Sequence, residues 1–486
     1  MKTLTIGLIA AALGLLGCAS SGLVERDGAT AISPRTAQQA AQMHDQIVAE
    51  FGGEVAGARG AYVDEIGRKV AAQSGIQGGG AGAFNFTIVN SPVPNAFAVP
   101  GGGIFITRQL LGLMDNEAEL ASVLGHEIGH ITEDHSKERQ DRGLLGQLGV
   151  LVTGILTGSG DLAQIAGLVS QGLFAQYSQG QEYEADEVGI SFMSRAGYDA
   201  DAAATLLASL GAVETLDRRI AGQDQRAVPS WARTHPNSRD RVERADALAG
   251  RVQPAGAGII NRDRYLQMID GMIWDDDPAQ GVIEDRTFLH PDLRIRFTVP
   301  PGYAINNGVR AVTIAGSGGQ AQFSGGRYGG SLDSYIAQVF RQLTGGRQQV
   351  RYPPPRRTTV NGIPAAYTTA QVRSQSGVVD VSVIAYQWDG DTAYHFVTVA
   401  RAGSQFGPFG SMVQSVGKLS ASQAAAVRPR VIDIVTVRSG DTPQSLAERM
   451  AYRTHKLERF LTLNSLGPDS RLQPGDKVKL VVYGSR

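Results

Sequence analysis

The motif at residues 125–130, Gly-His-Glu-Ile-Gly-His, constrains the fold of this 486-residue chain more than any other feature. Its two histidines, His126 and His130, can share one metal ion only if the segment is helical, because positions i and i+4 lie on one helix face. Apolar residues occur at the helical spacing that buries such a face: Leu120, Val123, Leu124 and Ile128. The sequence therefore predicts a helix over 117–135, with Asn116 as its N-cap and one side buried.

The residue types in this motif predict a zinc site that activates water. Imidazole nitrogens are common zinc ligands, and a catalytic zinc keeps one position open for water. Bound zinc lowers the pKa of that water to about 7, and Glu127, next to the first histidine, can take its proton. The competing interpretation is a solvated helix that carries two histidines by chance. With only eight histidines in the chain and an apolar flank beside the motif, the zinc site is favoured.

A zinc peptidase needs a third protein ligand, and Glu182 is the candidate. Glu182 and Asp186 are again four positions apart, and Glu182 lies 52 residues after His130. One carboxylate can thus bind the metal while the carboxylate one turn later supports a ligand imidazole. We expect Glu184 to point elsewhere, toward solvent or a helix neighbour. His135 should lie off the metal face as a polar residue at the helix end. The expected cofactor is one Zn²⁺ ion per chain.

Five segments within residues 36–250 resemble one family of zinc peptidases in their order and spacing. They are Asn-Ala-Phe-Ala at 95–98 before three glycines at 101–103, Asn-Glu-Ala-Glu-Leu at 116–120, the motif at 125–130, Glu-Tyr-Glu-Ala-Asp at 182–186, and Thr-His-Pro at 234–236 with Arg241. The family is that of the gluzincin peptidases, which include the CAAX prenyl endopeptidases and their soluble periplasmic relatives in outer-membrane quality control. The resemblance implies a mostly α-helical metallopeptidase domain with a small β-sheet.

The resemblance also implies roles for individual residues. It makes His126, His130 and Glu182 the zinc ligands, Glu127 the general base, and Asp186 a residue that supports the ligands. The relatives hold a substrate peptide by strand addition to an edge strand, which here implies 96–99 or 104–106.

His235 and Arg241 enter through the resemblance alone, and their roles stay open at this stage. His235 either donates a hydrogen bond to the oxyanion of the tetrahedral intermediate, or occupies the open zinc position in the resting enzyme until substrate displaces it. Arg241 either holds this loop through a carboxylate or contacts the oxyanion itself.

The N-terminal segment predicts export and lipid attachment. Residues 1–17 combine a lysine, an apolar run too short to span a bilayer, and a small residue, which are the features of a signal peptide. Leu-Leu-Gly-Cys at 15–18 resembles a lipobox, which implies cleavage before Cys18 and lipidation of its thiol. Residues 18–35 would then be a tether, and Ala19 favours the outer membrane, facing the periplasm. An ordinary secretory signal is the alternative.

The composition changes along the chain divide it into further units. The peptidase domain is expected over 36–253, and an α+β domain of unknown role over 259–425. Residues 433–483 resemble the LysM module, a small βααβ fold that binds N-acetylglucosamine chains such as peptidoglycan. The interrupted apolar run at 143–158 is expected to be a buried helix, with a loop that dips into the lipid interface or covers a cleft as the alternative.

Charge and composition restrict the function further. The chain has 45 basic and 46 acidic residues and a formal net charge of −1, so it lacks the basic footprint of a nucleic-acid-binding protein. The leading hypothesis is a membrane-anchored zinc endopeptidase acting on misfolded or stalled cell-envelope proteins or peptides. The alternatives are a periplasmic chaperone or assembly factor for outer-membrane proteins with little turnover, and a peptidoglycan-associated factor.

Overall fold

The computed structural model describes residues 32–76, 82–135, 177–220, 234–236, 239–344, 349–374 and 377–485. The predictions for the signal peptide, for Cys18 with most of the tether, and for the apolar run at 143–158 lie outside these residues. No helix within the described ranges has both the length and the apolar character needed to cross a membrane.

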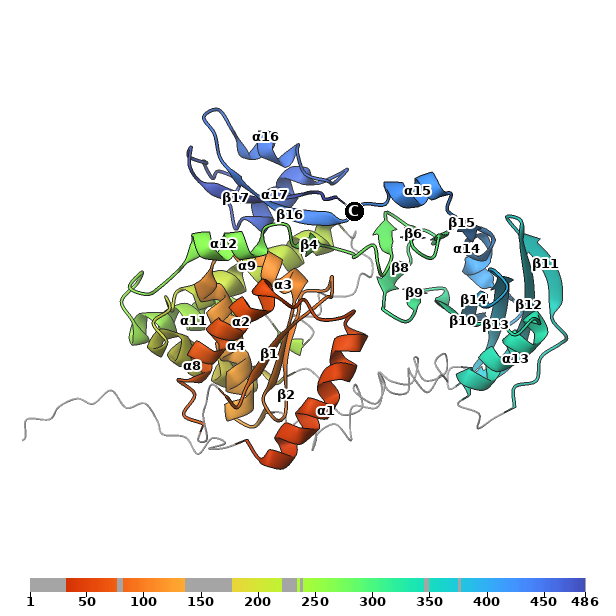
Figure 1. Cartoon of the computed structure of the whole chain (residues 1–486), viewed down its shortest axis with the longest axis horizontal. Helices are drawn as coiled ribbons and strands as arrows, with labels where there is room; N and C mark the ends of the chain where they lie inside the picture. The colour runs from red at the N-terminus through yellow and green to blue at the C-terminus, as the bar shows by residue number, and fades with distance from the viewer. Residues whose placement is uncertain are drawn as a thin grey trace, which may run out of the picture.

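A three-stranded sheet and a set of helices form the N-terminal region (Figure 1). The strands are β1 (Asn85–Val89), β2 (Ala96–Val99) and β3 (Gly103–Thr107), in the order β1-β3-β2. β1 runs parallel to β3, and β2 runs antiparallel to it. The helices are α1 (Pro34–Glu50), α2 (Ala58–Ala71), α3 (Arg108–Leu113), α4 (Glu117–Thr132), α8 (Gln179–Arg195), α9 (Ala202–Ile220) and α11 (Arg239–Val252).

Both faces of this sheet are covered. Side chains alternate between the two faces along each strand, and apolar side chains on both faces pack against helices. Phe97 and Phe105 pack with Ile47 of α1 in one apolar cluster. Ile104 and Ile106 belong instead to the main cluster, together with residues of α2 and α4. The sheet is therefore buried between α1 and the other helices, as its uniformly apolar strands require.

Helices α4 and α8 lie in unusually close contact, and glycines make this contact possible. A Cβ atom on Gly125 would lie 2.8 Å from the carbonyl oxygen of Gly189, and one on Gly189 would lie 2.7 Å from the backbone nitrogen of His126. The caps fix where the two helices begin. The Asn116 side chain accepts from the Glu119 amide, and Ser178 forms a capping box at the start of α8. The metal motif and the acidic segment at 182–186 are thus brought side by side.

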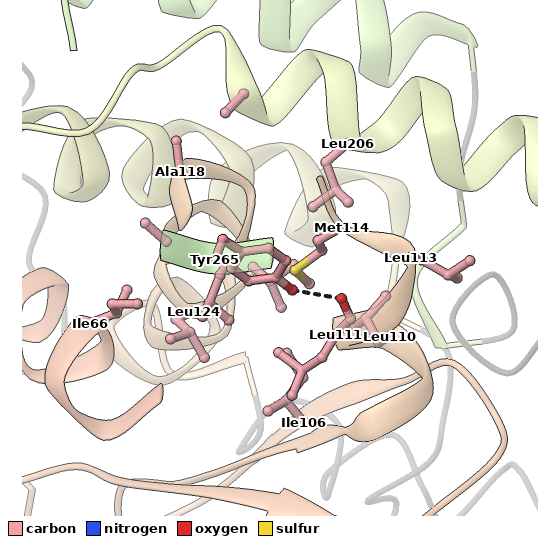
Figure 2. Packing of buried hydrophobic residues seen from close by; sticks show 14 of the residues in the cluster. Ile66, Ile106, Leu110, Leu111, Leu113, Met114, Ala118, Leu124, Leu206 and Tyr265 are labelled. Atoms are coloured by element: carbon pink, nitrogen blue, oxygen red, sulfur yellow. Dashed lines mark hydrogen bonds between the residues drawn. The ribbon is translucent and has the colours of Figure 1, made fainter. Parts of the chain in front are cut away.

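Helix α12 (Arg262–Ile269) completes the main apolar core. Its Tyr265 is fully buried, and the phenol donates a 2.6 Å hydrogen bond to the carbonyl oxygen of Leu111. Figure 2 shows this bond and the surrounding side chains, including Ile66, Met114 and Leu124. The bond fixes the end of α3, immediately before the helix that carries the metal motif.

The middle region is richer in β-structure than the expected α+β domain. Its seven-stranded antiparallel sheet has the order β11-β12-β13-β14-β10-β9-β8, and a four-stranded sheet has the order β15-β7-β6-β5. The strands are β5 (Val282–Glu284), β6 (Thr287–His290), β7 (Ile295–Thr298), β8 (Ala304–Asn307), β9 (Val312–Gly316), β10 (Gly319–Arg327), β11 (Arg356–Val360), β12 (Ile363–Ser374), β13 (Gly377–Gln387), β14 (Thr392–Arg401) and β15 (Gly417–Lys418). Helix α13 (Leu332–Leu343) packs on the larger sheet, and the helices α14 (Gly410–Gln414) and α15 (Ala421–Ala426) are short.

The C-terminal unit has the predicted strand–helix–helix–strand order, in β16 (Arg430–Thr436), α16 (Pro443–Ala447), α17 (Lys456–Leu463) and β17 (Lys477–Tyr483). β16 also pairs with β4 (Ile273–Trp274), so the sheet has the order β17-β16-β4. Its apolar residues, among them Phe460 and Leu480, share one core cluster with the peptidase residues. This unit is therefore packed onto the N-terminal region (Figure 1).

Candidate metal centre

Four buried side chains converge between α4, α8 and the short segment at 234–236. Each offers one ligand atom, and these atoms lie within 4.8 Å of one another: His126, His130, Glu182 and His235. The two Nε2 atoms of His126 and His130 are 3.0 Å apart, and Nδ1 of His235 lies 3.2 Å from the first of them. Oε1 of Glu182 lies 3.0 Å from Nδ1 of His235 and 3.5 Å from Nε2 of His130.

These separations fit a tetrahedral zinc site. Zinc–nitrogen and zinc–oxygen bonds of about 2.0–2.2 Å place the ligand atoms of a tetrahedron about 3.3–3.6 Å apart. The observed separations of 3.0–3.5 Å lie at or just below that range. The cluster offers three imidazole nitrogens and one carboxylate oxygen. Imidazole-rich sites bind zinc in preference to harder cations such as Mg²⁺ or Ca²⁺, which favour oxygen ligands. The residues present fit one Zn²⁺ ion.

Asp186 and Arg241 support the ligands from behind. Nδ1 of His126 lies 2.9 Å from Oδ1 of Asp186, on the side of the ring away from the cluster. The guanidinium of Arg241 donates to both oxygens of Asp186, at 2.9 and 2.7 Å, and its Nη1 lies 2.5 Å from Oε2 of Glu182. Arg241 thus holds two carboxylates in place. Of the two roles left open for Arg241, these contacts correspond to the first, in which Arg241 binds a carboxylate.

The same contacts keep both carboxylates ionised. Burial would raise the pKa of Glu182, but His235 and Arg241 outweigh burial and hold that pKa well below its usual value. Burial likewise opposes ionisation of Asp186, yet Arg241 and His126 lower its pKa. An anionic Glu182 is the form that binds a metal, and an anionic Asp186 is the form that accepts a hydrogen bond from Nδ1 of His126.

Glu127 lies at the edge of the cluster and has few contacts. Its side chain is fully buried, and neither carboxylate oxygen has a hydrogen-bond partner among the described residues. Nε2 of His235 lies 3.5 Å from Oε1 of Glu127. A buried carboxylate without hydrogen bonds costs free energy, so its presence here indicates a chemical rather than a structural use.

Two side chains that the sequence did not assign to the site, Tyr177 and His135, lie against His130. The ring of Tyr177 stacks on it, with centroids 3.6 Å apart and planes 8° from parallel. Nδ1 of His135 lies 2.9 Å from Nδ1 of His130, and Nε2 of His135 lies 3.2 Å from Oε2 of Glu184. As expected, neither His135 nor Glu184 offers a ligand atom to the cluster, but the two residues lie close behind His130.

A turn at the end of α4 brings His135 behind His130. The helix ends at Thr132, and Asp134 has the left-handed φ of 57°. His135 therefore does not continue the helical spiral from which its direction was predicted. No signal in the residue spacing reports such a turn. Tyr177 could have been noticed as an aromatic residue just before the capping box of α8.

The segment containing His235 is tied to neighbouring elements. The amide of Tyr177 donates to the carbonyl oxygen of Thr234 at 3.1 Å, and the Thr234 hydroxyl lies 3.4 Å from Oδ1 of Asn95. Asn95 directly precedes the strand β2. The imidazole of His235 is therefore held beside the start of β2, one of the two segments expected to bind substrate.

Comparison with known proteins gives this geometry a context. Residues 58–249 match the sequence model of peptidase family M48. A beta-barrel assembly-enhancing protease of Yersinia pestis is 32% identical over 205 residues, which cover 40% of this chain and 39% of that protein. The mitochondrial metalloendopeptidase OMA1 of Schizosaccharomyces pombe is 32% identical over 186 residues, which cover 38% of this chain and 51% of that protein.

A beta-barrel assembly-enhancing protease of Escherichia coli is also 32% identical, over 181 residues that cover 35% of each chain. The chain thus spans between about a third and a half of the length of these relatives. All four residues of the cluster fall inside the segment 58–249. The buried metal cluster therefore lies wholly within a region that matches a family of zinc-dependent metallopeptidases.

Proposed function

We propose that this protein is a membrane-anchored zinc endopeptidase that hydrolyses peptide bonds of misfolded or stalled cell-envelope proteins. The observation that carries the proposal is the buried cluster of three imidazoles and one carboxylate, with Glu127 beside it. The names of two relatives, beta-barrel assembly-enhancing proteases, support an envelope setting for the substrates.

The residues of the site have distinct tasks in this hydrolysis. His126, His130 and Glu182 would hold the zinc, which when bound lowers the pKa of a water molecule and polarises the scissile carbonyl. Glu127 takes the proton of that water and passes it to the leaving amine. Asp186 and Arg241 keep the ligands oriented, because a ligand that can rotate loses metal affinity.

The sheet topology favours one strand for the proposed substrate binding. β3 lies in the middle of the sheet and has neighbours on both sides, whereas β2 is an edge strand. Of the two segments expected from the sequence, only β2 can therefore accept an extended peptide as a further strand. Asn95 at its start contacts Thr234 of the His235 segment, which supports binding of such a peptide close to the cluster.

The position of His235 supports the gating role. Its Nδ1 occupies the fourth corner of the cluster, where water and substrate would bind. An imidazole in this corner would exclude water from the metal until substrate displaces it. Its Nε2 faces Glu127 at 3.5 Å, so the same ring also covers the general base.

Removal of the metal tests the proposed activity. The purified chain should cleave an unfolded protein such as casein, lose this activity with a zinc chelator, and regain it with about one equivalent of Zn²⁺. Metal analysis should show the same stoichiometry, and Glu182→Ala should abolish both readouts. A chain that binds zinc but captures the unfolded protein without cleaving it would favour the chaperone alternative, and a well-folded chain without zinc would refute the proposal.

The same assay decides the role of His235. As a gate, His235→Ala should raise basal cleavage while the zinc content stays the same, because the fourth position is then open to water. As an oxyanion donor, the substitution would instead lower turnover by about two to three orders of magnitude. Unchanged kinetics would remove His235 from the active site.

Membrane attachment and cell-wall binding complete the proposal. Lipidation of Cys18 and location in the outer membrane, facing the periplasm, rest on the lipobox resemblance. Peptidoglycan binding by residues 433–483 rests on their LysM-like order of elements. Cell fractionation tests both points. Cys18→Ser should leave the membrane fraction and lose its acylated N-terminal peptide, and the wild-type chain should sediment with purified sacculi.

A further inference from the structure

We propose that His135 and Glu184 are positioning residues that fix His130 as a metal ligand through a relay of two hydrogen bonds. The relay joins Nδ1 of His130 to Nδ1 of His135 at 2.9 Å, and Nε2 of His135 to Oε2 of Glu184 at 3.2 Å. It rests on the proposed function in one respect, namely that Nε2 of His130 binds zinc.

The proton positions in this relay follow from the direction in which His130 faces. Its Nε2 points into the cluster, so metal binding requires a lone pair there and places the ring proton on Nδ1. That proton can only be donated to Nδ1 of His135, which must then be the unprotonated nitrogen of its ring. The proton of His135 therefore sits on Nε2 and is donated to the Glu184 carboxylate. One arrangement of protons satisfies both rings.

Burial makes the relay effective. The His130 side chain is fully buried and that of His135 is 2% exposed, so water cannot replace His135 as the acceptor. The carboxylate at the far end is 45% exposed and can remain hydrated. Tyr177 stacks on the face of the His130 ring and restricts its tilt, while the relay fixes its rotation in the plane.

The two zinc-binding histidines of the motif are thus supported in different ways. His126 donates to Asp186, a carboxylate one turn after Glu182 on α8. His130 donates to the imidazole of His135, which in turn donates to Glu184, a second carboxylate of α8. A carboxylate that accepts a hydrogen bond from a ligand histidine increases the basicity of that histidine. In the relay, the ring of His135 lies between Glu184 and His130 and transmits this effect over a longer distance.

Zinc affinity of the full chain, measured by competition with a chromophoric chelator, tests the relay. His135→Leu should weaken zinc binding about 10- to 100-fold, the usual effect of removing such a supporting group. His135→Gln, whose amide oxygen can accept from His130, should restore part of that loss. Glu184→Gln should show a smaller loss, and Glu187→Gln, an exposed position on the same helix, should match wild type.

A direct readout of the protons separates positioning from simple packing. Two-bond ¹H–¹⁵N spectra of the zinc-loaded chain with labelled histidines should show His130 protonated on Nδ1 and His135 on Nε2. The reverse tautomer of His135, or a His135→Leu affinity within about twofold of wild type, would overturn the relay. If His135→Leu does not fold, the zinc affinity of Glu184→Gln decides by the same criterion, because the Glu184 side chain is 45% exposed and its substitution is less disruptive. Wild-type protein that fails to bind zinc would refute the proposed function instead.

Discussion

Replacing Glu127 by glutamine should lower kcat by about three orders of magnitude while zinc binding and stability stay close to wild type. General acid–base catalysis contributes roughly 10²- to 10⁴-fold, and glutamine cannot accept the proton of the bound water. The substitution keeps the size of the side chain. Neither oxygen of Glu127 has a hydrogen-bond partner among the described residues, so little structural contact is lost.

The measurements are turnover of an unfolded protein, zinc content, and thermal unfolding of the same preparations. Glu182→Ala is the contrasting variant, because it should lose activity together with the metal. In cells, the inactive Glu127→Gln chain should retain substrates that wild type releases as fragments, so proteins bound to it would identify the clients. Wild-type turnover in Glu127→Gln would show that another group is the base.

Replacing Lys479 by methionine should destabilise the region around the metal helix by about 3–5 kcal/mol, although Lys479 lies more than 340 residues after that helix in the sequence. The Lys479 ammonium is fully buried. It donates to the carbonyl oxygens of Gly112, Leu113 and Met114 at 3.2, 3.1 and 2.9 Å, and lies 3.1 Å from the Asp115 carboxylate. Its removal would leave a buried carboxylate and the last carbonyls of α3 without this partner.

The effect should reach the active site, because Asp115 directly precedes Asn116, the N-cap of α4. Hydrogen exchange should rise at residues 110–135 and in β17, and the denaturation midpoint should fall. Lys477→Met on the same strand is the matched control, since its partner Asp263 is 72% exposed and such pairs contribute about 1 kcal/mol or less. Equal stability of the two variants would show that the C-terminal unit is only loosely attached.

Part of the site can be predicted from residue spacing alone. The helix around 117–132, its N-cap Asn116, and the convergence of His126 and His130 follow from the i, i+4 geometry of a single helix, which depends on local bonds. The choice of Glu182 used the same periodicity on a second helix. Residue spacing does not predict that Glu182 lies against the first helix. That expectation came from chemistry, because a zinc site of this kind requires a third protein ligand.

The strand assignments of the peptidase region were also within reach of the sequence. β2 spans the expected segment 96–99, and β3 extends the expected segment 104–106 by one residue at either end, because alternating apolar residues are a local signal. Their order in the sheet was not predictable. Only the pairing of β1 with β3 places β3 in the middle of the sheet, so that of the two expected segments β2 alone lies at an edge.

The sequence by itself determined which residues could bind a metal, since that depends on side-chain chemistry and on periodicity within one helix. Only the tertiary structure decided what surrounds them. His135 reaches His130 because Asp134 adopts a left-handed conformation, and Glu184 meets His135 because glycines let α4 and α8 approach closely. Lys479 reaches the end of α3 from the far end of the chain. Such contacts arise from packing between distant segments, whose relative placement no local periodicity encodes.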